Sequence, residues 1–218
     1  MSDVSLTIDG HPVSVPAGTT IWDAAQQAGI DIPALCHDPR LEPVGVCRVC
    51  AVDIGERTLP AACVRAVSEG MEVRTQTDEI VAHRRVLTEL MLADQPALSQ
   101  REQTTGDDQL YALAREVKVT DIPWPDQSER QPRGQDLSSP VIAVDHQACI
   151  MCDRCVRACD EIQHNDVITR TGKGYTARIA FDLDVPMGES SCVACGECVA
   201  VCPTGALTHQ SMAATDAG

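Results

Sequence analysis

Two groups of four cysteines in the second half of the sequence share one spacing. Each group reads C-x2-C-x2-C-x3-C, and Pro203 follows the last cysteine of the second group. Three closely spaced cysteines can place thiolates around one face of an iron–sulfur cubane, while the fourth thiolate comes from elsewhere. The spacing predicts two [4Fe–4S] clusters, each taking its fourth ligand from the other group. The first would be bound by Cys149, Cys152, Cys155 and Cys202, and the second by Cys159, Cys192, Cys195 and Cys198.

Zinc sites and disulfide bonds are the alternatives for these eight cysteines. A zinc site needs only one close pair of cysteines from each group, so that thiols would be left without a metal. Disulfides belong to oxidising compartments, and Ser2–Leu6 shows neither the basic nor the apolar region of a signal peptide. We therefore expect iron–sulfur clusters in a reducing, cytoplasmic setting.

A third group of four cysteines stands nearer the start of the chain, with the spacing C-x10-C-x2-C-x12-C. It predicts a [2Fe–2S] centre, because four cysteine thiolates are ligands that such a cluster takes. A zinc site is one alternative, and His37 beside the first cysteine raises another, a Rieske centre. A Rieske centre needs two histidines on one iron, whereas four cysteines are already present here. The predicted ligands are Cys36, Cys47, Cys50 and Cys63.

The residues before this third group predict the start of a β-grasp fold. Residues 4–8 alternate between apolar and polar side chains, an Asp-Gly pair follows, and residues 12–15 resume a strand-like pattern. This order predicts a β-hairpin. Threonines at 19 and 20 and a glycine at 29 are typical of the two ends of a helix. A hairpin followed by a helix would place the cysteine loop directly after it.

The remaining elements are predicted from periodicity and from turn residues. Residues 79–93 have the pattern of an amphipathic helix, and residues 110–114 form a shorter one. Residues 141–144 read as a strand before the first cysteine run, and 168–181 as a hairpin with a Gly-Lys-Gly turn. The proline-rich stretch 120–140 is typical of an extended linker.

These patterns predict an α+β chain with five parts. An N-terminal β-grasp [2Fe–2S] ferredoxin-like domain comes first, and a C-terminal ferredoxin-like domain with two [4Fe–4S] clusters comes last. The predicted boundaries are 1–77 for the first domain, 78–119 for a helical segment, 120–140 for the linker, 141–209 for the second domain and 210–218 for a disordered tail.

The composition excludes several classes of protein. The 218 residues contain 17 Lys and Arg against 32 Asp and Glu, a net charge of −15. Such an acidic chain without a basic run is a poor candidate for binding nucleic acid. No apolar stretch approaches the roughly 18 residues that cross a bilayer. The sequence contains neither G-x-G-x-x-G nor a P-loop, so we expect no nucleotide site and no chemistry by the chain alone.

The spacing of the third group resembles that in the N-terminal domain of the large iron–sulfur subunit of respiratory complex I. It is also similar to the matching domains of NAD-linked hydrogenases, [FeFe]-hydrogenases and NAD-linked formate dehydrogenases. The ending Cys202–Leu207, C-P-T-G-A-L, resembles that of two-cluster ferredoxins. Over nearly its whole length the chain resembles the small iron–sulfur subunit of the diaphorase part of an NAD-linked [NiFe]-hydrogenase, or a shortened N-terminus of the complex I large subunit.

The resemblance also shows where this chain departs from those families. They hold a further [4Fe–4S] cluster with the motif H-x3-C-x2-C-x5-C, and the residues around that motif are present here. The ligand positions are occupied by Gln95, Ser99, Glu102 and Asp108. Oxygen atoms are poor ligands for a cluster that prefers thiolate, so we predict that this cluster is absent. An oxygen-rich metal site is the alternative, and we expect residues 99–109 to form a solvated loop.

The resemblance implies an electron-transfer subunit of a multi-subunit oxidoreductase. Its partners would be a flavin-bearing, NAD(P)-binding subunit and a catalytic subunit, a hydrogenase in the first place and a formate dehydrogenase in the second. The alternative is a free-standing soluble carrier of the ferredoxin type. Both interpretations imply one [2Fe–2S] and two [4Fe–4S] clusters as cofactors.

Overall fold

The computed structural model describes residues 2–124 and 132–213. Within the predicted linker, residues 125–131 lie outside the described residues, as do residues 214–218 of the predicted tail. The described part of that tail begins with a short 3-10 helix, Gln210–Met212.

The chain forms two compact units, each made of several stretches of sequence. The first unit comprises the residues up to 37, together with 43–88 and 113–120. The second comprises 38–42, 89–112 and the described residues from 121 onward. Both units combine strands with helices, which confirms the predicted α+β class.

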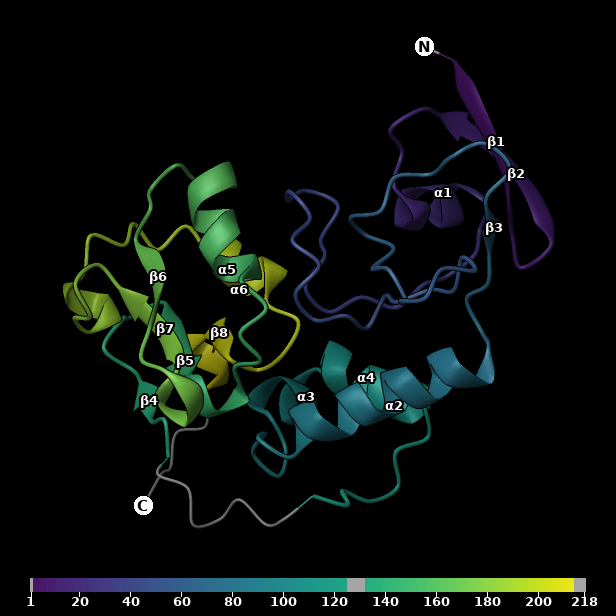
Figure 1. Ribbon diagram of the computed structural model, residues 1–218. Helices are drawn as coiled ribbons and strands as arrows, with labels where there is room; N and C mark the ends of the chain where they lie inside the picture. The colour runs from purple at the N-terminus through teal and green to yellow at the C-terminus, as the bar shows by residue number, and fades with distance from the viewer. Residues whose placement is uncertain (1, 125–131, 214–218) are drawn as a thin grey trace. The chain divides into compact units, whose positions relative to one another are not determined.

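The first unit is built on a three-stranded sheet with the order β2-β1-β3 (Figure 1). β1 (Asp3–Ile8) and β2 (His11–Pro16) form the predicted antiparallel hairpin. β3 (Glu72–Val73) pairs parallel to β1 and brings distant sequence to the same sheet. Helix α1 (Ile21–Gln27) starts at Thr20, whose hydroxyl accepts a hydrogen bond from the Asp23 amide at 3.1 Å.

Apolar side chains from the hairpin, from α1 and from the cysteine loops fill the core of this unit. Because strand side chains alternate, Leu6, Ile8 and Val15 point to one face, where they meet Ile21 and Ala24. Burying such side chains stabilises the fold by about 25 cal/mol for each Å² removed from water.

Helix α2 (Asp78–Leu92) confirms the predicted amphipathic helix, and its residues up to 88 belong to the first unit. Arg84 is buried there and donates to the carbonyl oxygens of Val49 and Ala51, at 3.1 and 3.3 Å. Burial lowers the pKa of Arg84. The two carbonyls belong to the loop that carries Cys50, so the helix holds that loop by its backbone.

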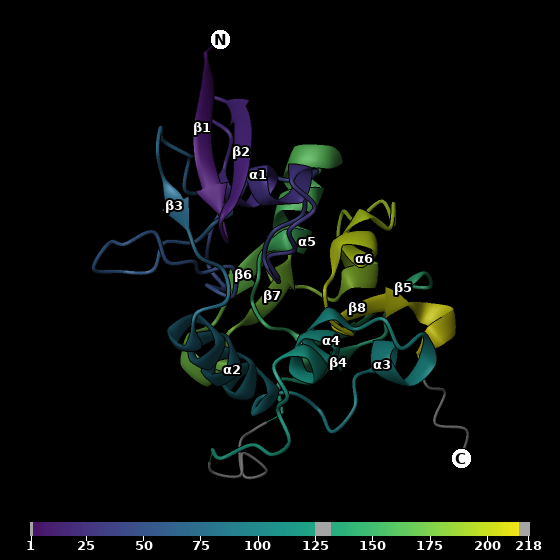
Figure 2. The ribbon, with the colours of Figure 1, turned by 90° about the vertical axis from the view of Figure 1, so that its right-hand side faces the viewer.

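The second unit contains a small antiparallel sheet and a separate hairpin (Figures 1 and 2). The sheet has the order β4-β5-β8, from Gln135–Asp136, Ile142–Asp145 and Leu207–His209. The hairpin pairs β6 (Ile168–Thr171) with β7 (Arg178–Phe181), as predicted. β5 enters the first cysteine run, and β8 leaves the second.

Each cysteine run of the second unit contains a short helix. α5 (Arg154–Arg157) continues into a π-helical turn at Ala158–Ile162, and α6 (Glu197–Val201) packs against both. The remaining helices are α3 (Gln100–Thr104), α4 (Gln109–Glu116) and the 3-10 turns His146–Ala148, Gly174–Thr176 and Met187–Glu189.

The stretch 99–109 differs from the predicted solvated loop. It contains α3, and both Ser99 and Asp108 are completely buried. Residues 103–107 and 109 are exposed, as predicted. The prediction was wrong for Ser99 and Asp108 because it took polar composition as a sign of exposure, whereas these two side chains bond to each other inside the protein.

Candidate metal centres

All twelve cysteines are free thiols, and they gather at three places. In the described residues no group of three or more His, Cys, Asp or Glu side chains is arranged to hold a single metal ion. The cysteines instead surround cavities or one another in groups of four, the arrangement on which the cluster prediction rests.

In the first unit, four thiols form one connected group. The Cys47 amide donates to the sulfur of Cys36 at 3.4 Å, and the sulfurs of Cys50 and Cys63 lie 3.5 Å apart. Hydrogen bonds from the thiols of Cys47 and then Cys63 lower the pKa of Cys36 to about 2. The same contacts raise the pKa values of Cys47 and Cys63. A hydrogen bond from the Cys63 thiol also lowers the pKa of Cys50, to about 7. Neighbouring thiols therefore favour the thiolate forms of Cys36 and Cys50, and iron would displace the protons that remain.

The loop that carries these thiols is held close to the rest of the first unit. Gly45 has a φ angle of +63°, and a Cβ atom there would lie 3.3 Å from both methyl groups of Val64. Arg48 also has a positive φ and donates to the Leu59 carbonyl at 2.7 Å. This confinement keeps the loop tightly wrapped around the sulfurs.

His37, the residue that raised a Rieske centre, lies against an aromatic ring. Its imidazole meets the Trp22 ring edge to face, with centroids 4.4 Å apart. Trp22 is in turn fixed by a 2.8 Å hydrogen bond from its indole N–H to the Ile32 carbonyl. The ligand set that the structure brings together in this unit is therefore the four thiols.

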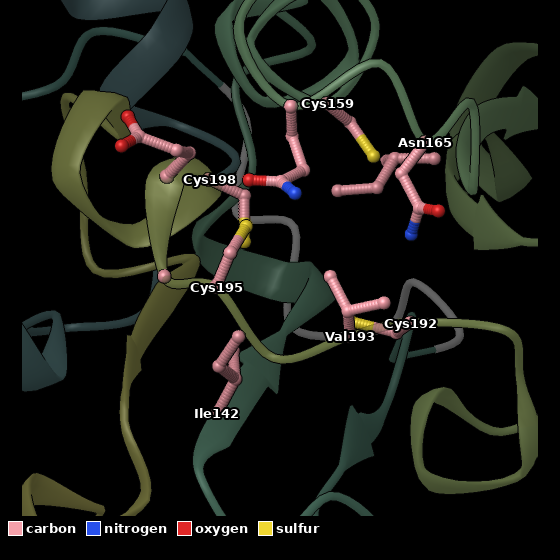
Figure 3. A pocket seen from close by; sticks show the side chains of 11 residues that line it. Ile142, Cys159, Asn165, Cys192, Val193, Cys195 and Cys198 are labelled. Atoms are coloured by element: carbon pink, nitrogen blue, oxygen red, sulfur yellow. The ribbon is translucent and has the colours of Figure 1, made fainter.

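In the second unit, two cavities are lined by cysteines from both runs. We call them the first cavity and the second cavity. The first cavity takes three cysteines from the first run and one from the second: Cys149, Cys152, Cys155 and Cys202. The second cavity takes three from the second run and one from the first: Cys192, Cys195, Cys198 and Cys159. Figure 3 shows the second cavity, with Cys159 facing the other three cysteines across it.

The two runs share one backbone geometry. Met151 and Asp153 in the first run and Ala194 and Gly196 in the second all have φ angles between 53° and 85°. The amide of Met151 donates to the sulfur of Cys149 at 3.4 Å, and the amide of Ala194 donates to Cys192 at the same distance. Amide hydrogen bonds to sulfur are one means by which proteins adjust a cluster's reduction potential.

Burial makes these thiols hard to ionise in the absence of a cation. It raises the pKa of Cys152 to about 12, with the charge of Cys202 adding to the effect. It raises the pKa of Cys198 to about 12 as well, and that of Cys155 strongly. A bound cation such as iron would favour the thiolate forms of Cys152, Cys155 and Cys198, and four cysteines around each cavity fit a cubane.

Several arginines hold the backbone around the first cavity. Arg133 donates to the carbonyls of Cys149 and Gln147 at 3.1 and 2.9 Å. Arg101 donates to the carbonyl of Cys202. The sequence contained no local signal for these contacts, because each arginine is separated from its partner by intervening elements.

Arg154 and Arg157 belong to the first cysteine run, and both side chains are buried. Arg154 bonds to Asp38 at 2.9 Å and to the Gln109 side chain at 2.8 Å. Arg157 donates to the carbonyl of Glu42. These partners come from residues 38–42, which belong to the second unit.

Among the four positions that resemble a further cluster motif, Ser99 and Asp108 bond to each other. The Ser99 hydroxyl donates to a carboxylate oxygen of Asp108 at 2.6 Å, and the Glu102 amide donates to Ser99 at 3.2 Å. Among the described residues, the side-chain amide of Gln95 has no hydrogen-bond partner. Ser99 caps α3, and Asp108 accepts from the amides of Leu110 and Tyr111 at the start of α4.

Comparison with known proteins identifies both domains. Residues 2–78 match the family model of a 2Fe-2S iron–sulfur cluster binding domain, and residues 148–206 match that of a 4Fe-4S dicluster domain. None of the helices among the described residues is both long enough and apolar enough to cross a membrane.

Two relatives match almost the whole chain. It is 37% identical over 216 residues to the NADP-reducing hydrogenase subunit HndD of Solidesulfovibrio fructosivorans, covering 96% of this chain and 36% of the relative. It is 35% identical over 207 residues to an NADH-quinone oxidoreductase subunit of Rhizobium meliloti, covering 94% and 24%. The chain thus spans about a third of the first relative and a quarter of the second.

Among solved structures, a chain of an NAD+-reducing [NiFe]-hydrogenase in its H2-reduced state has the same fold. The TM-score is 0.86 at 26% sequence identity, and the match covers 100% of this chain and 89% of the other.

Proposed function

Because the chain is an iron–sulfur electron-transfer protein that joins a 2Fe-2S binding domain to a 4Fe-4S dicluster domain, we propose that it relays single electrons within a multi-subunit oxidoreductase. Its neighbours are a flavin-bearing, NAD(P)-binding subunit on one side and a catalytic subunit on the other. The catalytic subunit is a hydrogenase in the first place and a formate dehydrogenase in the second, and the assembly works in the cytoplasm.

One observation carries this proposal: each cavity of the second unit is lined by three cysteines of one run and the fourth of the other. This exchange of fourth ligands is the arrangement of a protein with two cubanes. A single zinc ion would use four ligands and leave other thiols without a role, whereas here all eight thiols face one of two cavities.

The proposed cofactors are one [2Fe–2S] and two [4Fe–4S] clusters, which supply one-electron redox centres when bound. Cys36, Cys47, Cys50 and Cys63 hold the first of these, Cys149, Cys152, Cys155 and Cys202 the second, and Cys159, Cys192, Cys195 and Cys198 the third. The chain's own contribution is to bury most of these sulfurs and to direct backbone amides at them. Both properties set the reduction potential of a cluster.

The cluster content is tested by measuring iron in protein purified without oxygen. We expect about ten irons per chain, since one [2Fe–2S] and two [4Fe–4S] clusters contain that number. About fourteen would mean that the positions around Ser99 and Asp108 hold a further cluster after all. Zinc in place of iron would refute the electron-transfer proposal.

The role as a subunit is tested separately, by native purification of the tagged chain from its own cells. We expect a flavin-containing subunit and a catalytic subunit to co-purify, together with NAD(P)-dependent reduction of the clusters. If the chain migrates alone with its full iron content, it is a free-standing carrier and the subunit proposal is wrong.

A further inference from the structure

The stretch 99–109 of the second unit is bonded directly to the loop that follows Cys202. The amide of Gln109 donates to the Pro203 carbonyl at 2.8 Å, and the amide of Gly205 donates to a carboxylate oxygen of Asp108 at 3.2 Å. Arg101 donates to the carbonyl of Cys202 itself. Three contacts therefore hold the backbone of a proposed cluster ligand and of the residues just after it.

The Ser99–Asp108 pair lies at the centre of this arrangement. Neither residue is exposed to solvent. The carboxylate of Asp108 accepts from the Ser99 hydroxyl and from the amides of Leu110, Tyr111 and Gly205. Burial raises the pKa of Asp108, and these four hydrogen bonds oppose that rise because they favour the ionised form. With the carboxylate accepting all four, the pair places a buried negative charge against the Cys202 loop.

Packing makes the contact between these two stretches close. A Cβ atom at Gly205 would lie 2.8 Å from the Cβ of Ser99 and 3.1 Å from the amide nitrogen of Arg101. Such distances leave no room for adjustment, so the position of the loop depends on the position of Ser99.

The same stretch supplies a positive charge. The Arg101 side chain is 19% exposed and is paired in two-pronged fashion with Asp107, at 2.9 Å for both bonds. The Arg101 guanidinium donates to the carbonyl of Cys202, so its charge lies beside that proposed ligand. An arginine side chain stays positively charged in proteins.

We propose that Ser99, Arg101 and Asp108 are positioning residues for Cys202 and that Arg101 and Asp108 set the reduction potential of the cluster in the first cavity in opposite directions. This inference rests on the proposed cluster ligation. At the positions that resemble ligands of a further cluster, the chain has residues that hold the Cys202 loop of the cluster in the first cavity.

The test is an anaerobic redox titration of the intact chain, followed by electron paramagnetic resonance of the two cubanes. Arg101→Gln removes a positive charge, so the first cubane should bind its electron about tenfold less tightly, a shift of about 59 mV for a one-electron couple. Asp108→Asn removes a negative charge and should shift the same potential upward. The cubane of the second cavity, measured in the same samples, is the internal reference.

Two control variants make comparable changes in the first unit, which holds neither of the two cubanes. Thr20→Ala removes a helix cap of the first unit, and Arg74→Gln removes an arginine that is paired with Asp53 at 2.7 Å. Neither should change the potential of a cubane. Arg101→Lys keeps the charge and should keep most of the potential, even though it loses the two-pronged geometry.

Shifts of the same sign in Arg101→Gln and Asp108→Asn, or equal shifts of both cubanes, would overturn the inference. If Asp108→Asn does not fold, the Arg101 variants decide alone: no shift of the first cubane in Arg101→Gln is the contrary result. A wild-type chain without cubane iron would instead refute the proposed function, so the two failures are distinguishable.

Discussion

The two cavities of the second unit have the same ligand spacing and backbone geometry, but they differ in their surroundings. Cys152, Cys155 and Cys202 of the first cavity are less than 10% exposed, and arginines bind the carbonyls of Cys149 and Cys202. In the second cavity Cys195 is exposed, and the neighbouring Val193 is 58% exposed. Identical ligand sets can therefore hold clusters in unequal environments.

With both proposed clusters in place, this difference would give the two cavities different properties. Exposure and nearby charge both change the potential of an iron–sulfur cluster, so the two cubanes should not share one potential. An exposed ligand loop also brings a cluster close to whatever binds that surface. We expect the second cavity to be the one that exchanges electrons with a partner.

The largest expected effect comes from Cys159, which belongs to the first run but lines the second cavity. Cys159→Ala should lower the iron content from about ten to about six per chain. Adding Cys195→Ala should remove no more iron, because both residues serve one cluster. Adding Cys152→Ala instead should leave about two irons. If each cluster were instead bound by the four cysteines of one run, the iron contents of the two double variants would be exchanged. Iron analysis distinguishes the two outcomes.

The next effect concerns how readily each cubane loses iron. Because Cys195 is exposed, an oxidant with an iron chelator should release about four irons from the second cavity several-fold faster than from the first. The fast phase should be missing from Cys159→Ala and retained in Cys202→Ala. A fast phase that disappears only in Cys202→Ala would show that the first cavity is the labile one.

A smaller effect is the loss of stability when a glycine next to either cavity is replaced by alanine. Gly205→Ala forces a Cβ atom to within 2.8 Å of the Ser99 Cβ and should lower the free energy of unfolding by about 1–3 kcal/mol. Gly196 has a φ of +85° and open space beside it, so Gly196→Ala should cost about 1 kcal/mol of backbone strain. Anaerobic calorimetry of the loaded protein measures both. A larger loss for Gly196→Ala would contradict the role of close packing at the first cavity.

The smallest effect is a dependence on pH near the first cavity. Burial lowers the pKa of His146, nearby Arg178 and Arg133 lower it further, and Asp136 and Asp145 oppose them. In the unfolded chain His146 binds a proton near pH 6.5, whereas in the folded chain it does so only at lower pH. Stability therefore falls as the pH falls below about 6.5. The loss approaches about 1.4 kcal/mol per pH unit.

His146→Gln should remove that part of the pH dependence. The measurement is the difference in melting temperature between about pH 7.5 and about pH 5.5, in the wild type and in the variant. Equal differences in both proteins would show that His146 does not titrate in this way.

The sequence was sufficient where local spacing determines structure. The two cysteine runs predicted two shared sites because the gaps of two and three residues set the turns around a cluster. The hairpin at residues 3–16 and the cap at Thr20 also depend on neighbours in sequence.

The sequence was insufficient where the decisive partner is distant. Gly205 bonds to Asp108 across 97 residues, and Arg154 bonds to Asp38 across 116. Without those partners, Ser99 and Asp108 were interpreted as residues of a solvated loop, and nothing in the sequence indicated that Arg154 bonds to Asp38. The place of residues 38–42 in the second unit was missed for the same reason.

The double cap formed by Ser99 and Asp108 would make the proposed absence of the further cluster hard to reverse in evolution. A cluster forms only when all of its ligands are in place, so a first cysteine at either position would bring no iron. It would instead break a helix cap, which costs about 1 kcal/mol, and leave a buried partner unsatisfied. Each single substitution towards the cluster motif would therefore lower stability, and cluster binding would follow only after the last of them.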